Sequence, residues 1–264
     1  FKQKTAYEIS TRDWSSDVCS SDLWIHFFQL YLVFIASSLK YSMDTIFDIP
    51  STWHGHRDFA HWLVQRLNPQ VTVDLGVDLG FSMFSLAEKN TGHVWGIDTF
   101  EGDDHEGHKQ GTYEQCMAYK DALGLNNITV LKDTFEHVAE TWRRPIDILH
   151  VDGFHTYEAV KSDFMLWAKF VKDDGVVLLH DTVSFFDVAK FFEEINLPKI
   201  MFRESAGLGV VCMDANFIQE IKDAFPHAIR REDIEDTILK IKQDADRARG
   251  GTIGSAMFKR AQTE

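Results

Sequence analysis

Acidic and imidazole side chains follow two predicted strands late in the chain, and their types suit metal or acid–base chemistry. Asp152 and His155 come after one predicted strand, and His180 and Asp181 follow the next. Carboxylates from two neighbouring strand ends can share a hard divalent cation. Such a cation would bind the vicinal hydroxyls of a ligand and lower the pKa of one of them. The sequence therefore predicts a candidate catalytic or metal-binding cluster here.

The imidazole of His180 departs from an all-oxygen metal site. Imidazole binds manganese, iron or zinc better than magnesium, so a Mg or Mn site made of Asp152, Asp181 and His180 would favour manganese. Alternatively, His180 supports the ligands from behind, or His155 or His180 acts as a general base beside Asp181. A purely structural alternative is that these residues cap the following helices and hydrogen-bond one another.

A glycine-rich stretch follows an earlier alternating, β-branched run at 71–75. Asp74, Gly76, Gly80 and Ser82 mark a strand, a tight turn and the start of a helix, which together suit a nucleotide-sized ligand. Glycine lets the backbone approach a ligand, so we expect a side chain at position 80 to occupy the ligand's space. The spacing Asp-x-Gly-x-x-x-Gly differs from the Gly-x-Gly-x-x-Gly of dinucleotide folds, which argues against a nicotinamide cofactor. A turn that only changes the chain's direction remains an alternative.

The next strand end carries Asp98 and Thr99. An acidic residue there, after a glycine-rich first turn, is placed to accept hydrogen bonds from two ribose hydroxyls. A helix-capping or turn role is an alternative for Asp98. Further candidates for substrate contact are His105 and Asp103 in the polar loop after this strand, and His56 before the first helix of the regular pattern.

Strands and amphipathic helices alternate from residue 45 onward. This alternation predicts an α/β fold with a doubly wound, mostly parallel sheet, a C-terminal antiparallel hairpin and trailing helices. Ligands of such sheets bind outside the carboxyl ends of the strands, where the polar residues lie. Helices are expected over 57–67, 82–88, 113–123, 136–142, 157–171 and 186–194, and strands over 71–75, 93–97, 128–131, 146–151, 176–179, 200–203 and 209–213.

Composition narrows the class of protein. The 264 residues are 44% hydrophobic, which suffices for one domain with a sizeable core. The formal net charge of -14 argues against nucleic acid as a partner. Three widely spaced cysteines predict neither disulfides nor structural zinc and are typical of a cytoplasmic protein.

The chain divides into three expected parts. Residues 1–42 are interpreted as a non-native or disordered segment, because 11–23 lack periodicity and resemble translated sequencing-adapter read-through. The native start would then lie near Met43. The apolar run 23–39 is too short for stable membrane insertion. Residues 43–215 form the main domain, and 216–264 form helices, suited to packing or a homo-oligomer contact, and a loose tail from 249.

The stretch His150-Val-Asp-Gly-Phe-His-Thr-Tyr-Glu-Ala-Val-Lys-Ser-Asp-Phe and the later Gly-Val-Val-Leu-Leu-His-Asp-Thr182 carry a family resemblance. They resemble the class I S-adenosylmethionine-dependent methyltransferases, specifically methyltransferase domain type 24. Trp53-x-Gly-His56, Gly102-Asp-x-His-x-Gly107 and Gly207-Leu-Gly-Val210 extend the resemblance over about residues 50–213. The family usually begins its first motif with Glu, where this chain has Asp74.

The resemblance implies a seven-stranded sheet and S-adenosylmethionine as cofactor. It implies that Asp98 holds the ribose, with Thr99 beside it. The other implied cofactor residues surround the methionine part, lie against the adenine or follow the fourth strand, and they are Asp74, Gly76, Gly80, Ser82, Asp133, Thr134, Phe135 and Asp152.

The expected reaction is O-methylation of a sugar or another small polar hydroxyl acceptor, with a small molecule or glycan as partner. Three alternatives stay open. One is a hydroxylase-like or other non-methylating enzyme of the same fold. Another is a NAD-type oxidoreductase, and the third is a non-catalytic binding protein.

Overall fold

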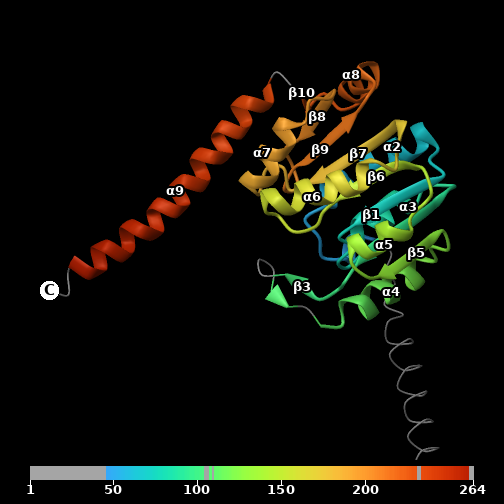
Figure 1. Ribbon diagram of the computed structural model, residues 1–264, viewed down its shortest axis with the longest axis horizontal. Helices are drawn as coiled ribbons and strands as arrows, with labels where there is room; N and C mark the ends of the chain where they lie inside the picture. The colour runs from blue at the N-terminus through green and yellow to red at the C-terminus, as the bar shows by residue number, and fades with distance from the viewer. Residues whose placement is uncertain (1–45, 104–106, 109, 231–232, 262–264) are drawn as a thin grey trace, which may run out of the picture. The chain divides into compact units, whose positions relative to one another are not determined.

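A computed structural model describes residues 46–103, 107–108, 110–230 and 233–261 (Figure 1). The expectations for residues 1–42 and for His105 lie outside these ranges. The strands of the main sheet are β1 (Val71–Leu75), β2 (His93–Asp98), β5 (Ile128–Lys132), β6 (Ile146–Val151), β7 (Val171–His180), β8 (Lys199–Phe202), β9 (Leu208–Cys212) and β10 (Ile229–Arg230). Two short strands, β3 (Gly102–Asp103) and β4 (Gly107–His108), pair separately.

The helices alternate with the strands. They are α2 (Arg57–Leu67), α3 (Phe81–Ala87), α4 (Thr112–Leu123), α5 (Phe135–Thr141), α6 (Tyr157–Ala168), α7 (Phe186–Glu194), α8 (Ala215–Ala224) and α9 (Ile234–Ala261), preceded by the 3-10 turns η1 (Ile46–Asp48) and η2 (His54–His56). Among the described helices, none combines the length and the apolar composition that a bilayer span needs.

The main sheet has the order β10-β8-β9-β7-β6-β1-β2-β5. The pairs β6·β7, β1·β6, β1·β2 and β2·β5 are parallel, whereas β9 pairs antiparallel with both β7 and β8. This confirms the predicted doubly wound α/β fold with an antiparallel end. The described sheet has eight strands, one more than the expected seven, because the two-residue β10 pairs with β8.

The predicted boundaries differ from the structure by more than one residue in two places. The helix expected over 157–171 ends at Ala168, and β7 begins at Val171 and runs for 10 residues across a register irregularity opposite β6. The loose tail expected from residue 249 is instead part of α9, which continues through Gly250 and Gly251 to Ala261. Both differences arise because glycine and aspartate residues were interpreted as breaks between elements. In the structure, the strand and the helix continue through these residues.

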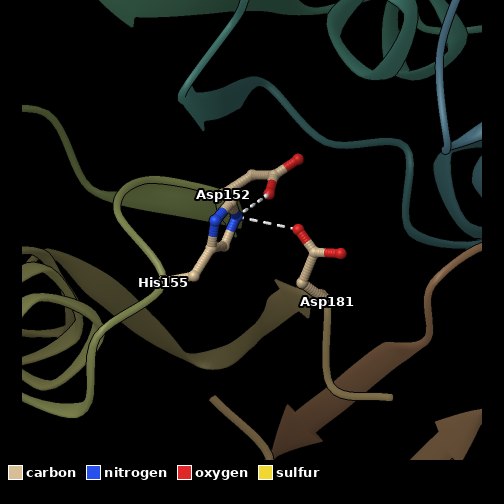
Figure 2. Close-up of side chains that lie close together, drawn as sticks. All are labelled: Asp152, His155 and Asp181. Atoms are coloured by element: carbon tan, nitrogen blue, oxygen red, sulfur yellow. Dashed lines mark ion pairs between the residues drawn. The ribbon is translucent and has the colours of Figure 1, made fainter. Parts of the chain in front are cut away.

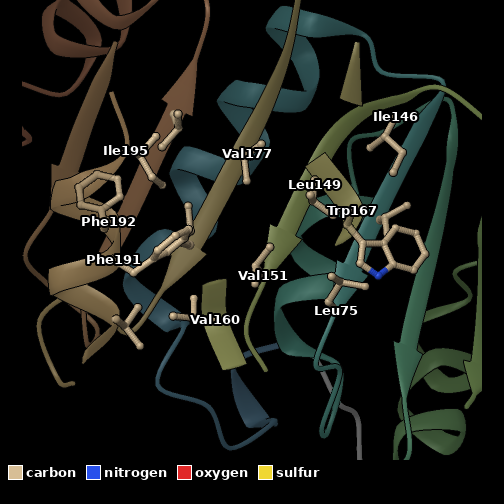
Figure 3. Close-up of a cluster of buried hydrophobic side chains, with 14 of the residues drawn as sticks. Leu75, Ile146, Leu149, Val151, Val160, Trp167, Val177, Phe191, Phe192 and Ile195 are labelled. Carbon is tan, nitrogen blue, oxygen red and sulfur yellow. The ribbon is translucent and has the colours of Figure 1, made fainter. Parts of the chain in front are cut away.

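The core lies between the central strands and the helices that cover them (Figure 3). Leu75, Leu149 and Val151 on β1 and β6 are at most 2% exposed, and Trp167 of α6 and Phe192 of α7 are fully buried. Strands covered on both faces are apolar almost throughout, which explains why few polar residues occur before the strand ends. The start of α9 joins this core through buried Ile234.

The strand order reverses at β1, which lies between β2 and β6. The connection from β1 through α3 leads to β2, whereas β6 flanks β1 on the other side. Crevices open at such a reversal, outside the carboxyl ends of the strands. The fold therefore places the glycine turn after β1 beside the acidic residues that follow β6.

Candidate active site

A cleft of about 560 Å³ opens at the carboxyl ends of β1, β2, β5, β6 and β7. It collects residues that are more than a hundred positions apart in the sequence. Its lining is Pro50 to Trp53, Gly76 to Ser82, Asp98 to Phe100, Gly102, Thr112, Thr134 to Glu136, Asp152 to His155 and Asp181. Of the predicted cofactor residues, the cleft includes Gly76, Gly80, Ser82, Asp98, Thr99, Thr134, Phe135 and Asp152.

The glycine turn after β1 forms one wall of the cleft. Gly76 has φ +89°, and a Cβ added there would lie 1.8 Å from the carbonyl oxygen of Asp152, so only glycine fits between the two strand ends. Gly80 has φ +95°, and an added Cβ would lie 2.5 Å from the ring of Phe84. The expectation that a side chain at 80 would occupy the ligand's space was wrong, because that side chain would point into the packing beneath α3.

Asp74 does not line the cleft, contrary to its predicted role as a direct cofactor contact. It is fully buried on β1, in register with His150 on β6. His150 Nδ1 lies 2.5 Å from Asp74 Oδ1, and the hydroxyl of Ser82 donates to Asp74 Oδ2 at 2.8 Å. Trp53 Nε1 donates to His150 Nε2 at 3.2 Å. Asp74 therefore does not contact the cleft itself. It holds Ser82 directly and Trp53 through His150, and both Ser82 and Trp53 line the cleft.

Asp98 lines the cleft at the end of β2. Its Oδ2 accepts the backbone N–H of Asp78 at 2.9 Å, and its Oδ1 accepts that of Phe100 at 2.7 Å. Burial raises the pKa of this carboxyl, and the backbone hydrogen bonds partly oppose the effect. The backbone of Val77 is a third hydrogen-bond partner of this carboxyl, and a carboxylate has about four lone-pair positions, so roughly one remains for a ligand.

The residues after β5 divide into two groups. Thr134 and Phe135 line the cleft, and the Thr134 side chain accepts the N–H of His137 as the cap of α5. Asp133, predicted to lie against a ligand, is outside the lining. Its carboxylate accepts from the Thr134 N–H at 2.8 Å and contacts His137 Nδ1 at 2.7 Å, and these two contacts hold its pKa below the usual range.

Asp152, His155 and Asp181 converge at the other end of the cleft (Figure 2). His155 Nε2 lies 2.8 Å from Asp181 Oδ2 and 3.7 Å from Asp152 Oδ1, and one ligand atom from each residue lies within 4.8 Å of the others. The His155 ring stacks on Phe185 with centroids 4.2 Å apart. Asp181 has φ 61°, a left-handed conformation that costs a non-glycine residue energy and is common at functional sites.

His180 lies behind this group and its side chain is only 1% exposed. Its Nε2 is 2.9 Å from the carbonyl oxygen of Ser205, and because a carbonyl can only accept, Nε2 carries the proton. Its Nδ1 consequently points at the carboxylates, 3.3 Å from Asp152 Oδ2 and 3.4 Å from Asp181 Oδ2. The structure thus brings all four predicted residues together, but the group with metal-ligand spacing contains His155 in place of the predicted His180.

The four side chains shift one another's proton affinity. Burial alone would lower the pKa of His155 and of His180, but the carboxylates of Asp152 and Asp181 outweigh it and raise both to about 10. Burial alone would raise the pKa of Asp152, but the charge of His180 and the hydrogen bonds from both histidines hold it well below its usual range. Positive charge is therefore strongly favoured between these carboxylates.

His56 is not in the cleft, contrary to its predicted contact with substrate. It is fully buried, its Nε2 lies 3.1 Å from the Ser205 carbonyl oxygen, and its ring packs against Trp53 and Phe202. Burial, followed by the charge of His180, lowers its pKa to about 3. Asp103 belongs to the short strand β3, and its contact with substrate stays a prediction.

Sequence reasoning missed several cleft residues. Ser51 and Thr52 precede η2, and Phe100 and Phe154 follow β2 and β6. Phe100 has φ 57°, an unusual backbone for an aromatic residue that no sequence pattern indicates. The sequence could have indicated Phe154, because this residue lies inside the Asp-Gly-Phe-His run, whose Asp and His were predicted as site residues.

A protein-family model described as a methyltransferase domain matches residues 73–182. This match confirms the resemblance stated from the motifs, and it spans the glycine turn and both histidine-bearing strand ends. An uncharacterized protein of Sinorhizobium fredii, y4gI, is 32% identical over 182 residues, which cover 64% of this chain and 20% of that protein. The chain thus spans about a fifth of the length of this curated relative.

Two solved bacterial structures share the fold. One, provisionally named a caffeoyl-CoA O-methyltransferase from Staphylococcus aureus, has a TM-score of 0.53 at 13% identity and covers 71% of this chain and 100% of its own. The other, provisionally named an O-methyltransferase from Klebsiella pneumoniae, has a TM-score of 0.50 at 13% identity and covers 61% and 80%. At these identities the likeness establishes the fold alone.

Proposed function

We propose that this chain, whose residues 73–182 match a methyltransferase domain, transfers a methyl group from S-adenosylmethionine to a hydroxyl oxygen of a sugar or another small, polar, uncharged acceptor. The observation that carries the proposal is the presence, in one cleft, of a glycine turn after β1 and a carboxylate–imidazole cluster after β6 and β7. The glycine turn suits the cofactor, and the carboxylate–imidazole cluster suits the acceptor.

S-adenosylmethionine is the cofactor of the proposed reaction. When bound, it supplies a methyl group on a positively charged sulfur, which an acceptor oxygen can attack in line. Asp98 has about one lone-pair position left for a ribose hydroxyl, and Thr134 and Phe135 lie on the next strand end outward, where the adenine would follow. The turn from Gly76 to Gly80 exposes backbone close to the ligand's other end.

A divalent cation fits the Asp152, His155 and Asp181 group. One ligand atom from each of the two carboxylates and the imidazole lies within 4.8 Å of the other two, and His180 directs its Nδ1 toward the same carboxylates. Its other nitrogen donates to a backbone carbonyl, which is the usual support of a metal-binding histidine. A bound cation would lower the pKa of an acceptor hydroxyl. Mixed oxygen and imidazole donors favour manganese over magnesium.

The charge of the cleft argues for an uncharged acceptor. Its described lining holds five acidic residues and no lysine or arginine; the acids are Asp78, Asp98, Glu136, Asp152 and Asp181. Phosphate and carboxylate groups are normally bound by arginine or lysine forks, so a phosphorylated or acidic acceptor would meet like charge. Neutral vicinal hydroxyls would instead find carboxylate and imidazole acceptors, and one of these groups takes the proton that the attacking oxygen loses.

The proposal can be tested with the full chain, methyl-labelled S-adenosylmethionine and a panel of neutral sugars and catechols beside their phosphorylated counterparts. We expect label on a neutral acceptor with vicinal hydroxyls. Excess chelator or Asp181→Asn should reduce turnover far more than cofactor affinity, and manganese should restore it at least as well as magnesium. Asp121→Asn, which removes an exposed acid on α4, is the matched control.

Label on none of the acceptors would refute methyl transfer to this class. Full activity in excess chelator, with no metal found by elemental analysis, would refute the cation and leave the histidines as the acid–base groups. Label only on phosphorylated acceptors would refute the argument from the cleft's charge.

A further inference from the structure

The connection between β8 and β9 contains residues 204–207, which we call the β8–β9 turn, and its backbone is unusual. Ser205 and Ala206 have φ 50° and 69°, and Gly207 follows with φ +94°. Left-handed backbone is ordinary for glycine but costs serine and alanine energy, and hairpin turns with two such residues usually carry Asn-Gly. Strain of this kind persists only where surrounding contacts hold the chain in place.

Two consecutive carbonyl oxygens of the β8–β9 turn accept hydrogen bonds from the chain around the end of β7. The Ser205 oxygen accepts from His180 Nε2 at 2.9 Å. The Ala206 oxygen accepts the backbone N–H groups of residues 183–184 at 2.9 and 3.1 Å. The turn is therefore bonded to the chain on both sides of Asp181.

The Trp53-x-Gly-His56 motif also holds this turn. Ser205 Oγ accepts the backbone N–H of Gly55 at 2.8 Å, and the Ser205 carbonyl oxygen accepts from His56 Nε2 at 3.1 Å. A Cβ added at Gly55 would lie 2.4 Å from Ser205 Oγ, so glycine allows the close approach of the turn to η2. The motif thus acts on the turn, since His56 is buried outside the cleft.

His180 and Asp181 both depend on a fixed orientation. Because its Nε2 is held by the turn, His180 directs its Nδ1 toward Asp152 Oδ2 at 3.3 Å and Asp181 Oδ2 at 3.4 Å. Asp181 has φ 61°, and its Oδ2 lies 2.8 Å from His155 Nε2 (Figure 2). A rotated His180 ring, or an Asp181 that returned to extended backbone, would move the carboxylates away from the imidazoles.

We propose that the β8–β9 turn positions the carboxylate–imidazole cluster, with Ser205 orienting the His180 ring and Ala206 fixing the backbone that follows Asp181. The inference rests on the proposed function, because it takes this cluster as the group that handles the acceptor. None of residues 204–207 lines the cleft, so they act through His180 and Asp181. The contacts that keep the turn strained are the same contacts that hold the site.

Substitutions at the half-buried Ala206 test the proposal in the full chain. Ala206→Val puts a β-branched residue at φ 69° and should displace the turn, whereas Ala206→Gly adopts this backbone freely. With S-adenosylmethionine and a neutral acceptor that has vicinal hydroxyls, we expect Ala206→Val to lower kcat by about tenfold or more. The Kd of S-adenosylhomocysteine should change by less than about twofold, and Ala206→Gly should retain at least about half of the wild-type kcat.

A second measurement needs no turnover and follows the His180 hydrogen bond directly. In chain carrying isotope-labelled histidine, a buried Nε2–H bonded to a carbonyl exchanges slowly with water and gives an NMR signal. His180→Gln assigns this signal by its loss. We expect Ala206→Val to speed the exchange of this proton by about tenfold or more and Ala206→Gly to leave the exchange slow.

Asn68→Val is the matched control. Asn68 has φ 46° at the end of α2, outside the cleft lining, so this variant places valine in left-handed backbone away from the site. It should lower the free energy of unfolding and leave both kcat and the His180 exchange rate unchanged. A folded Ala206→Val with wild-type kcat and slow exchange would overturn the inference, and so would an equal loss of kcat in Asn68→Val.

Ser205→Gly replaces Ala206→Val if the valine variant is unfolded by circular dichroism. It removes the Oγ contact with Gly55 without adding bulk, and it should speed the His180 exchange and lower kcat by about threefold or more. Wild-type values for both would overturn the inference. Failure of the wild type to methylate any acceptor would refute the proposed function, and the exchange rates would still decide whether the turn holds His180.

Discussion

Replacing His150 with phenylalanine should destabilise the fold through Asp74, even though neither residue lines the cleft. Trp53 Nε1 can only donate, so His150 Nε2 accepts and Nδ1 carries the hydrogen that Asp74 Oδ1 receives at 2.5 Å. His150→Phe removes both contacts. It leaves a fully buried carboxylate with the Ser82 hydroxyl as its remaining hydrogen-bond donor and leaves the indole N–H of Trp53 unpaired.

The expected cost follows from that uncompensated buried charge. Breaking a buried pair by removing one partner costs about 3–5 kcal/mol. For a domain of this size, each kcal/mol lowers Tm by about 2–4 °C, so we expect a fall of about 6–20 °C. Urea denaturation followed by tryptophan fluorescence and circular dichroism measures the free energy of unfolding, and a thermal melt measures the shift in Tm.

A double-mutant cycle tests whether the loss of stability comes from the contact between Asp74 and His150. In the wild-type background, Asp74→Asn should cost about 1–2 kcal/mol, because a charge-assisted hydrogen bond becomes a neutral one. In the His150→Phe background the same substitution should stabilise the protein, because it removes the unpaired charge. If Asp74→Asn destabilises both backgrounds equally, or if His150→Phe costs less than about 1 kcal/mol, the account of this pair is refuted.

Three further predictions concern the cleft wall and α6. Gly80→Ala should lower the free energy of unfolding by about 2 kcal/mol or more, because φ is +95° and the new Cβ meets Phe84; a denaturation midpoint equal to that of the wild type would contradict this. Thr134→Ala should cost about 1 kcal/mol through loss of the α5 cap, and Thr134→Ser should recover most of it. Asp163 has a folded-state pKa of about 7, above its unfolded value, so the folded state binds its proton more tightly and this group's contribution to stability falls as pH rises from about 4 to 7. Asp163→Asn should flatten that part of the curve of unfolding free energy against pH, and a slope unchanged from wild type would show that burial does not perturb the group.

The fold was predictable because its signals are local. Apolar β-branched runs that stop at Asp or Gly mark the parallel strands, and helices such as α2 and α7 carry a clear apolar stripe, so their predicted bounds agree with the structure. The same local signals fail where an element runs through a Gly. Gly175 lies within β7, and Gly250 lies within α9.

The site was predictable as a region but not residue by residue. Strand ends gave Asp98, Asp152 and Asp181, since parallel strands end at one edge of the sheet. Which polar groups pair beneath that edge depends on register between strands, and no local pattern reports that Asp74 lies opposite His150. Titratable residues near the carboxyl ends of two buried strands, Asp74 and His150, were the available hint, because buried polar groups must be satisfied.

The position of His56 shows the same limit. Its place in a Trp-x-Gly-His motif indicated a function but not a direction, and packing turned the ring into the core against Phe202. The sequence also does not indicate which of the two side chains, His155 or His180, reaches the cleft. The backbone after β6 carries His155 to the cleft surface, whereas His180, the last residue of β7, lies beneath it.

Calorimetric titration of the full chain with S-adenosylhomocysteine tests the central claim most directly, because every proposed step requires that the cleft binds the cofactor. The account predicts saturable binding that is at least tenfold weaker in Asp98→Ala, which loses the proposed ribose acceptor, and unchanged in Asp121→Asn on the exposed face of α4. Absence of binding to the folded wild type, or equal binding by Asp98→Ala, would contradict it.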